Sequence, residues 1–343
     1  MRFWLTLLLL PTMACAANGY KAEKITDHGV QVVRLTDAAH GASVSIAPSV
    51  GNRAFAFTVH GQNLLYFPLT SIAAPQARRL NGIPFLAPWA NRMAEGGFWA
   101  NAKKYQFNPN LGTLRLDRND IAIHGMLIGS PLWKVVDLGA DKHSAHVTSR
   151  LQFWKYPNLM ANWPFAQTYE MTYTLANGVL EVTTRVKNLS AKPMPVVIGF
   201  HPFFHIPGVP RSEASIHIPA REHVETNRLL VPTGVMKPVN LPQWISLKDH
   251  IYDDGYTDLV RGSNGRAVFE EKAGSKEIQV LFGSHYPVGV VWAPPGRQFV
   301  CFEPMAAVTN GANLAHYGKY NELQKLAPGA TWEGSFWVRA SGF

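Results

Sequence analysis

Arg92, His201 and Glu303 have the residue types and surroundings in this chain that are best suited to chemistry. They lie far apart in the sequence, and each stands beside an apolar run. Together they supply a cation, an imidazole and a carboxylate. Because imidazole titrates near neutral pH and a carboxylate can exchange protons with it, this set suits proton transfer on a neutral polyol such as a sugar.

Arg92 closes the segment NGIPFLAPWANR (residues 81–92), directly after Asn91. The two prolines of this segment disfavour a helix. An arginine presents a planar fork of donors that holds hydroxyls or a carboxylate without losing its charge. A structural or surface role is the alternative, but the apolar neighbours favour a side chain that points into a groove.

His201 lies in PVVIGFHPFF (residues 195–204), where Pro202 is expected to end an apolar strand. We therefore expect its imidazole to be held at a strand end among aromatic residues. His205 raises the alternative of a metal site, but that spacing needs a helix to bring both rings to one side. Pro202 and Pro207 oppose a helix, so we expect no metal here.

Glu303 follows the apolar run QFVCF and precedes Pro304, so we expect it to terminate a buried strand. An ionised carboxylate is expensive to bury without partners, and such a position therefore indicates nearby donors or a functional purpose. Cys301, in the same run, is expected to be a small buried hydrophobe rather than a nucleophile.

His124 and the pair Asp253–Asp254 are weaker candidates. His124 precedes Gly125, which permits close approach of another chain segment, although a core histidine is the default interpretation. The two aspartates precede Gly255, a pattern more typical of a turn than of a site. The alternative is that they accept hydrogen bonds from sugar hydroxyls.

The elements that must position these residues are predicted to be strands. Apolar and polar residues alternate over 168–175 and 180–187, and Asn177-Gly178 between them predicts a hairpin. A second hairpin is expected over 267–282, and no 15-residue window has a helical stripe. Further strands are expected at 30–35, 42–46, 55–59, 133–138, 145–153, 196–200, 289–293 and 332–338. The fold class predicted is all-β, a large antiparallel β-sandwich.

The composition is that of a packed globular protein, with 47% apolar and 16% charged residues among 343. The formal net charge is +9, but the lysines and arginines are dispersed, which argues against a nucleic-acid partner. An acidic or phosphorylated sugar would suit the basic excess, and solubility explains it equally well.

The N-terminus has the pattern of an export signal: Arg2, the apolar run 3–10, and the small residues Ala14 and Ala16 around Cys15. We expect a signal peptide at residues 1–17, a single domain at 18–343, and a secreted or periplasmic protein without stable membrane insertion. A lipoprotein acylated at Cys15 is the alternative. The oligomeric state is left open.

The motifs resemble those of the aldose 1-epimerase (galactose mutarotase) family. The resemblance rests on five segments: residues 82–92 ending in Asn-Arg, His124-Gly125, residues 199–204, Asp253 with Tyr256, and Glu303-Pro304 followed by Thr309-Asn310 and Asn313-Leu314. It implies a galactose mutarotase-like supersandwich and an isomerase that needs no cofactor and acts on a monosaccharide. Phe200 and Pro202 flank His201 where the commoner form of the family has Asn and Tyr.

Carried over by position, the resemblance implies that Glu303 is the general base and His201 the general acid. Arg92, His124, Asp253 and Asn91 are then expected to hold the sugar, with Asp254 as the alternative to Asp253. Three other functions stay open: a hexose-6-phosphate 1-epimerase, a non-catalytic carbohydrate-binding β-sandwich protein, and a sugar hydrolase or lyase with a second carboxylate beside the first.

Overall fold

Antiparallel strands make up nearly half of residues 19–343, the part of the chain that this computed structural model describes. The predicted signal peptide, residues 1–17, lies outside it. The only two α-helices among the described residues have six residues each, α1 (Pro157–Asn162) and α2 (Gly311–His316), and neither is long enough to cross a membrane. The predicted all-β antiparallel fold is confirmed.

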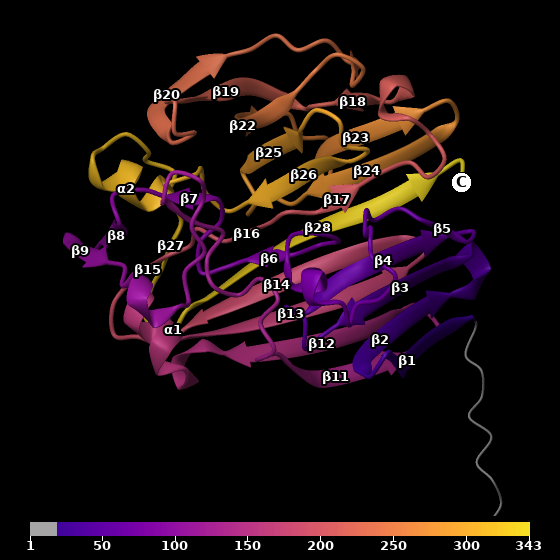
Figure 1. The fold of residues 1–343 in the computed structure, drawn as a ribbon, viewed down its shortest axis with the longest axis horizontal. Helices are drawn as coiled ribbons and strands as arrows, with labels where there is room; N and C mark the ends of the chain where they lie inside the picture. Colours follow the sequence, from indigo (N-terminus) through magenta and orange to yellow (C-terminus); the bar gives the residue numbers. More distant parts are fainter. Residues whose placement is uncertain (1–18) are drawn as a thin grey trace, which may run out of the picture.

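Three sheets carry the architecture (Figure 1). The nine-stranded sheet has the order β11 (Lys134–Ala140), β12 (Ala145–Gln152), β13 (Gln167–Ala176), β14 (Val179–Asn188), β28 (Thr331–Ser341), β24 (Lys276–Phe282), β23 (Ala267–Ala273), β18 (Ser215–His217), β21 (Ile245–Ser246). The eight-stranded sheet has the order β20 (Pro232–Pro238), β19 (Ala220–Thr226), β22 (Tyr252–Leu259), β25 (Val288–Ala293), β26 (Val300–Met305), β16 (Gly199–Phe200), β6 (Phe85–Leu86), with β17 (Phe203–Phe204) also paired to β26.

The remaining strands form smaller sheets. The five-stranded sheet is β1 (Tyr20–Asp27), β2 (Val30–Asp37), β3 (Ala42–Ala47), β4 (Arg53–Val59), β5 (Gln62–Asn63). Three two-stranded pairs are β7 (Arg92–Met93) with β10 (Ala122–Ile123), β8 (Gly97–Ala100) with β9 (Lys103–Gln106), and β15 (Met194–Pro195) with β27 (Lys325–Leu326).

The predicted hairpin at Asn177-Gly178 is confirmed. Asn177 has φ 50° and Gly178 φ 71°, both positive, as a two-residue type I′ turn requires. The turn sets the register in which Leu175 faces Leu180 and Tyr173 faces Val182, so the apolar residues of β13 and β14 share one buried face.

That buried face runs across the nine-stranded sheet. A cross-strand row of side chains joins Leu175, Leu180, Val338, Val280 and Phe269, all of them buried. Two smaller sheets cover it (Figure 1): β1 and β2 contact β11, β12 and β13, and the eight-stranded sheet covers the β23 end.

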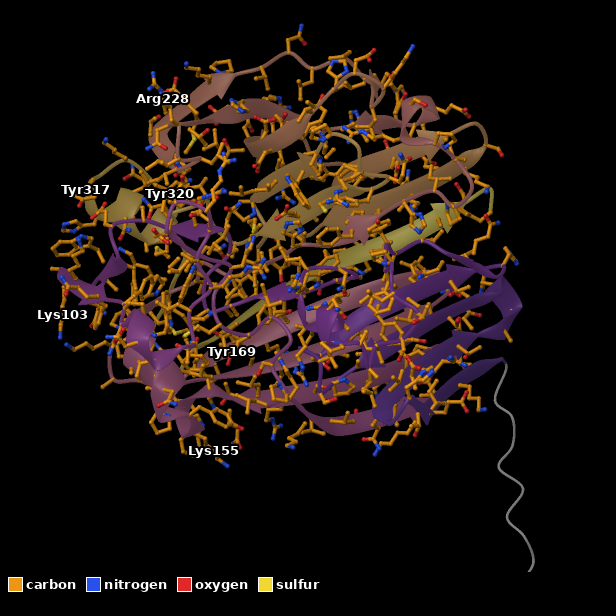
Figure 2. All side chains as sticks on the ribbon, viewed as in Figure 1. Lys103, Lys155, Tyr169, Arg228, Tyr317 and Tyr320 are labelled. Atoms are coloured by element: carbon orange, nitrogen blue, oxygen red, sulfur yellow. The ribbon has the colours of Figure 1, made fainter. Side chains whose placement is uncertain are left out.

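Aromatic contacts fill the layer between the sheets. Phe269 of β23 lies 5.8 Å from Phe302 of β26 between ring centroids. Tyr169 of β13, labelled in Figure 2, lies 5.5 Å from Phe85 of β6. Because these contacts fill one face of the eight-stranded sheet, its other face is available for a site.

Three local expectations were wrong. Asp253 and Asp254 do not form a turn but lie inside β22, where Gly255 faces Val290 of β25. The strand expected at 196–200 is reduced to β16, Gly199–Phe200. Tertiary pairing, which the local pattern does not contain, decides both cases.

Glu303 does not end its strand either, since β26 continues through Pro304 to Met305. On one side of β26, β16 pairs only with Met305 and β17 with Cys301 and Val300. The ladder is therefore interrupted beside Pro304, and a proline is tolerated where no ladder bond is required.

Candidate active site

Glu303, Trp292 and Asp253 project from the face of the eight-stranded sheet that points away from the core. Cross-strand pairing places Asp253, Trp292 and Cys301 in one row over β22, β25 and β26. Glu303 lies two positions after Cys301 and so shares its face, whereas Phe302 between them packs into the core. The sheet thus brings the predicted carboxylate and the predicted sugar-binding aspartate to one surface.

His201 meets Glu303 on this face. Its Nε2 lies 3.3 Å from Oε1 of Glu303, and both side chains are buried. The backbone N–H of His201 donates to the carbonyl of Pro84 at 3.1 Å, and the imidazole stacks on Phe203 with ring centroids 4.7 Å apart. The ring of Trp292 packs edge-to-face with the imidazole, with ring centroids 5.3 Å apart. The expectation of an imidazole held among aromatic rings is confirmed.

Burial sets the proton affinities of this pair. It raises the pKa of Glu303 well above its usual value, and the negative charge of Asp253 raises it further, while Arg92 acts in the opposite direction. Burial lowers the pKa of His201 to about 3. Desolvation penalises the charged form of each group, so the uncharged forms are favoured and the pair holds one proton between them.

Two polar atoms of the pair have no partner among residues 19–343: Nδ1 of His201 and Oε2 of Glu303. An unpaired buried polar atom is costly, so these atoms are ready to bind a polar ligand. His124 adds a third such atom, its Nδ1, and its ring lies 5.4 Å from that of His201. Burial lowers the pKa of His124 well below its usual value, and the neighbouring His201 adds to this effect.

His124 is held in an unusual conformation, with φ 62°. Its N–H donates to the carbonyl of Asn91 at 2.9 Å. A Cβ on the next residue, Gly125, would lie 2.1 Å from the carbonyl oxygen of Ala87. The expectation that this glycine permits a close approach is therefore confirmed.

Arg92 starts β7 and is paired with Ile123 of β10. Its Nε donates to Asp117 at 2.7 Å, and its backbone N–H donates to Oδ1 of Asn91 at 2.9 Å. Asn91 has φ 53°, a left-handed conformation that asparagine tolerates better than most residues. Sequence reasoning missed Asp117, whose only signal was its place in the polar segment RLDRND before the strand of His124.

Register distinguishes Asp253 from Asp254. Asp253 shares the face of Glu303, and burial raises its pKa. Asp254 points to the opposite face, where its carboxylate lies 2.8 Å from Nε2 of His223. A small hollow of about 20 Å³ is lined by both aspartates together with Asn91 and Thr309.

Helix α2 ties the segment of Arg92 to the end of β26. The N–H of Asn310 donates to the carbonyl of Arg92 at 3.0 Å, and Oδ1 of Asn310 accepts from the N–H of Ala94 at 3.0 Å. Asn313 accepts from the N–H of Trp99 at 3.0 Å and donates to the carbonyl of Gly97. The family resemblance singled out both asparagines in the sequence, but it did not predict that they join these two segments by hydrogen bonds.

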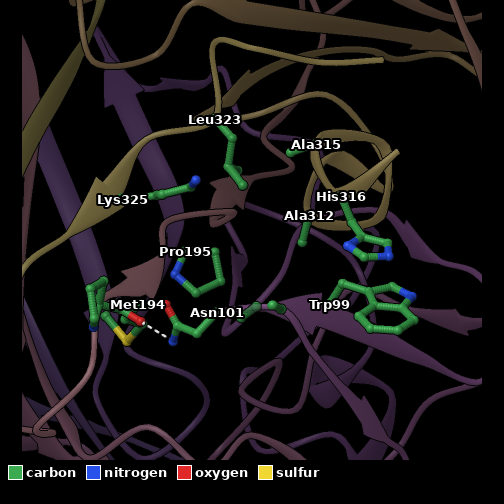
Figure 3. A pocket seen from close by; sticks show the side chains of 12 residues that line it. Trp99, Asn101, Met194, Pro195, Ala312, Ala315, His316, Leu323 and Lys325 are labelled. Atoms are coloured by element: carbon green, nitrogen blue, oxygen red, sulfur yellow. Dashed lines mark hydrogen bonds between the residues drawn. The ribbon is translucent and has the colours of Figure 1, made fainter. Parts of the chain in front are cut away.

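Another hollow, of about 310 Å³, is bordered by Ala312, Ala315 and His316 of α2 (Figure 3). Trp99 and His316 stack at one end of it with ring centroids 3.8 Å apart, and Lys325, Met194 and Asn101 line the remainder. None of the predicted site residues lines this hollow. Among residues 19–343, no group of three His, Cys, Asp or Glu side chains is placed to hold a metal ion.

Residues 31–339 match the profile of the aldose 1-epimerase family. Among solved structures, a galactose mutarotase-like protein from Clostridium acetobutylicum is 20% identical with a TM-score of 0.83, over 95% of this chain and 99% of that chain. Galactose 1-epimerase from Lactobacillus acidophilus is 15% identical with a TM-score of 0.71, over 94% and 100%. A putative aldose 1-epimerase from Escherichia coli is 16% identical with a TM-score of 0.65, over 95% and 100%.

The structural likenesses fall below 25% identity and establish the galactose mutarotase-like fold. The profile match covers most of the sequence, from before β3 to within β28. The matched residues include Arg92, His124, His201 and Glu303. The last two form the buried pair described above. The chain therefore belongs to the aldose 1-epimerase family, a family of isomerases.

Proposed function

We propose that this protein interconverts the α and β anomers of an aldopyranose, with Glu303 and His201 as the groups that exchange protons with the sugar. The observation that carries the proposal is the 3.3 Å contact between Nε2 of His201 and Oε1 of Glu303 in a buried setting. One acid and one base suffice for this reaction, and no cofactor takes part.

Ring opening starts with Glu303 ionised and His201 protonated. Glu303 takes the proton of the C1 hydroxyl, His201 gives a proton to the ring oxygen, and the bond between C1 and the ring oxygen breaks to leave an aldehyde. Rotation about C1–C2 then presents the other face of the aldehyde. During closure His201 takes the proton back from the ring-oxygen hydroxyl, and Glu303 returns one to the oxygen on C1.

Burial stabilises one of the two protonation states of the pair relative to the other. It favours the uncharged pair, with Glu303 protonated and His201 neutral, which is the protonation state reached after ring opening. The charged pair that begins the cycle is disfavoured. A sugar hydroxyl that donates to Oε2 of Glu303 and a sugar oxygen that accepts from Nδ1–H of the protonated His201 offset that cost. Each positioned acid or base contributes about 10²–10⁴-fold, and fixing the ring adds to this by orientation.

Arg92, His124, Asp253 and Asn91 hold the sugar in this proposal. Asp117 aims the guanidinium of Arg92, and Asn91 supports its backbone. His124, uncharged because of its burial, serves as a hydrogen-bond partner for a hydroxyl rather than as a charge.

We also place the protein outside the cytoplasm, secreted or periplasmic, with residues 1–17 removed as a signal peptide and residues 18–343 as one domain. The pattern of Arg2, the apolar run and Ala14–Ala16 supports this placement. N-terminal sequencing of the protein recovered from the exported fraction tests it. A chain that begins at Met1 contradicts it, and an acylated Cys15 at the N-terminus selects the lipoprotein form.

Polarimetry on freshly dissolved α-glucose and α-galactose, with and without the protein, tests the proposed reaction. We expect the approach to anomeric equilibrium to accelerate in proportion to protein concentration. An unchanged rate, together with sugar binding in calorimetry, would replace this proposal with a non-catalytic carbohydrate-binding role. Release of new reducing ends from a glycoside would instead favour a hydrolase.

A further inference from the structure

The hollow of about 310 Å³ beside α2 is separate from the buried pair of Glu303 and His201 (Figure 3). Four segments that lie far apart in the sequence border it: β8 with the turn that follows, β15, α2, and β27 with the residues before it. None of the residues proposed to bind the sugar or to exchange protons with it lines this hollow. Small-molecule sites start at about 300 Å³, so the hollow is large enough for a ligand of its own.

Most of the wall of this hollow is apolar. Met194 and Pro195 of β15 and Ala312 of α2 border it although they are buried. Leu323, which is partly buried and packs against the same core, completes this wall (Figure 3). Apolar surface gains free energy when it is removed from water, so such a wall favours a ligand with an apolar body.

The turn between β8 and β9 adds a methyl group to the wall at a cost in backbone strain. Asn101 has φ 52° and Ala102 has φ 57°, and the preferred sequence for such a two-residue turn is Asn followed by Gly. Alanine is strained here because its Cβ crowds the backbone in a left-handed conformation. Ala102 lines the hollow, and Nδ2 of Asn101 donates to the carbonyl of Pro193 at 2.8 Å, which anchors the turn there. A strained residue at a cavity wall is typical of a functional site.

Lys325 gives the hollow one strongly basic group. It lies directly opposite Pro195 in the ladder of β15 and β27, so both side chains project to the face that lines the hollow. Lys325 makes no ion pair among residues 19–343, where the lysines in ion pairs are three others. No aspartate or glutamate of the described chain lines the hollow. The charge of Lys325 is therefore available to an anion.

Trp99 and His316 lie on the opposite side of the hollow from Lys325 (Figure 3). Their ring planes differ by only 6° at 3.8 Å between centroids, so each ring covers one face of the other. A sugar needs open aromatic faces and several hydrogen-bonding groups, whereas the only other polar side chain in this lining is that of Asn101. The lining thus favours one charged group on an apolar body over a sugar.

We propose that this hollow is a second ligand site, which binds a small monocarboxylate with an aromatic body. The carboxylate pairs with Lys325, and the body packs against Pro195 and Leu323 and meets the stacked rings of Trp99 and His316. Aromatic rings attract one another in stacked and edge-to-face arrangements, so a ring suits this end of the hollow. At about 30 Å³ for each water-sized group, the volume holds about ten non-hydrogen atoms, which is the size of phenylacetate.

Calorimetry with phenylacetate, its neutral amide phenylacetamide and the cation 2-phenylethylammonium tests the proposed ligand class. We expect phenylacetate to bind one to one and about 5-fold more tightly than the amide, because an exposed charge pair contributes modestly, and the cation to bind most weakly. The preference should shrink at about 0.5 M NaCl, where exposed charges are screened. No binding of phenylacetate, or equal affinity for all three compounds, would overturn the proposal.

Lys325→Gln and Lys325→Glu test the assigned cation. Lys325 is exposed, so neither variant disturbs the core. We expect Lys325→Gln to weaken phenylacetate about 5-fold and to leave phenylacetamide unchanged, and Lys325→Glu to prefer 2-phenylethylammonium over phenylacetate. Lys142→Gln, an exposed lysine between β11 and β12, is the matched control. Wild-type affinity for phenylacetate in Lys325→Gln contradicts the assignment.

Ala315→Leu and competition with galactose locate the bound ligand. Ala315 lines the hollow from α2, and leucine there occupies part of the space, so we expect both phenylacetate and its amide to bind at least about 10-fold more weakly. Circular dichroism checks that the variant folds, and the two Lys325 variants decide the question if it does not. Galactose should leave phenylacetate binding unchanged, whereas displacement by galactose would place the anion beside Glu303 and overturn the proposal. These titrations need no turnover, so their result is independent of the proposed reaction.

Discussion

Asp117 accepts a 2.7 Å hydrogen bond from Nε of Arg92 while its other carboxylate oxygen accepts from the backbone N–H groups of Asn119 and Ile121. One carboxylate thus shapes the loop that leads into β10 and aims the arginine of β7. The side chains of both partners are largely shielded from solvent, which strengthens their attraction relative to a surface pair.

Asp117→Asn should weaken sugar binding, because the amide removes the charge that holds Arg92. A hydrogen bond to a charged group contributes about 1.5–3 kcal/mol, so we expect kcat/KM to fall about 10- to 100-fold, mainly through KM. Steady-state polarimetry measures the change. Asp258→Asn is the control, since the pair of Asp258 with Arg221 is exposed. Equal effects of the two variants would contradict the positioning role.

Glu303→Gln should lower kcat at least about 100-fold, because the amide cannot exchange the proton of the C1 hydroxyl. Glu271→Gln, which changes a buried glutamate of another strand, should leave kcat intact and serves as the control. Circular dichroism checks that both variants fold. If Glu303 and His201 act as one unit, the double variant with His201→Asn is scarcely slower than either single variant.

The pH profile of kcat/KM, which reports the ionisation of the free enzyme, should show a broad plateau through neutrality. The reaction needs one proton on the pair, so activity falls when both groups are protonated or both are deprotonated. Burial lowers the pKa of His201 to about 3 and raises that of Glu303. The acid limb of the profile therefore moves to lower pH and the alkaline limb to higher pH. A half-maximal point near the ordinary histidine value of 6.5 would contradict the burial effect.

Glu271→Gln should stabilise the protein at alkaline pH. Glu271 faces the core from β23, its Oε2 has no partner among the described residues, and burial raises its pKa to about 8. A folded-state pKa above the unfolded value costs stability progressively as pH rises from 4.5 to about 8. We expect the variant to gain on the order of 4 kcal/mol in urea unfolding at pH 9. The same measurement at pH 4 should show almost no difference.

Gly125→Ala should destabilise the fold and impair activity. Gly125 has φ 64°, and an added Cβ would lie 2.1 Å from the oxygen of Ala87, so the segment that carries His124 must shift. Gly112→Ala is the matched control, because Gly112 has φ 65° but no atom within 4 Å of the added Cβ. We expect the control to lose about 1 kcal/mol and Gly125→Ala to lose several times that in thermal unfolding.

Local patterns predict much of this fold. The turn signal Asn177-Gly178 and the alternation of apolar and polar residues on either side of it are sufficient to predict the β13–β14 hairpin. His201 and Glu303 could each be predicted as a site residue because each stands beside an apolar run, and their assignment as acid and base came from the family resemblance. Their contact at 3.3 Å could not be predicted, because it depends on which strands become neighbours.

The wrong predictions also arise because the local sequence does not specify which strands become neighbours. The Asp253-Asp254-Gly255 sequence is locally typical of a turn, yet β25 pairs with all three residues and holds them extended, and β19 pairs with β22 from Tyr256 onward. Two-residue strands such as β16 carry too little pattern to be predicted from local sequence.

The short strand β16 joins β6 on one side to β26 on the other, so Leu86, Gly199 and Met305 become neighbours although most of the chain separates the first from the last. Closing such large loops is entropically costly and slows folding. The contact between His201 and Glu303 can therefore form only after nearly the whole polypeptide has left the ribosome, since Glu303 emerges among its last residues. In refolding from urea, turnover should return after the fluorescence of the core tryptophans has become native.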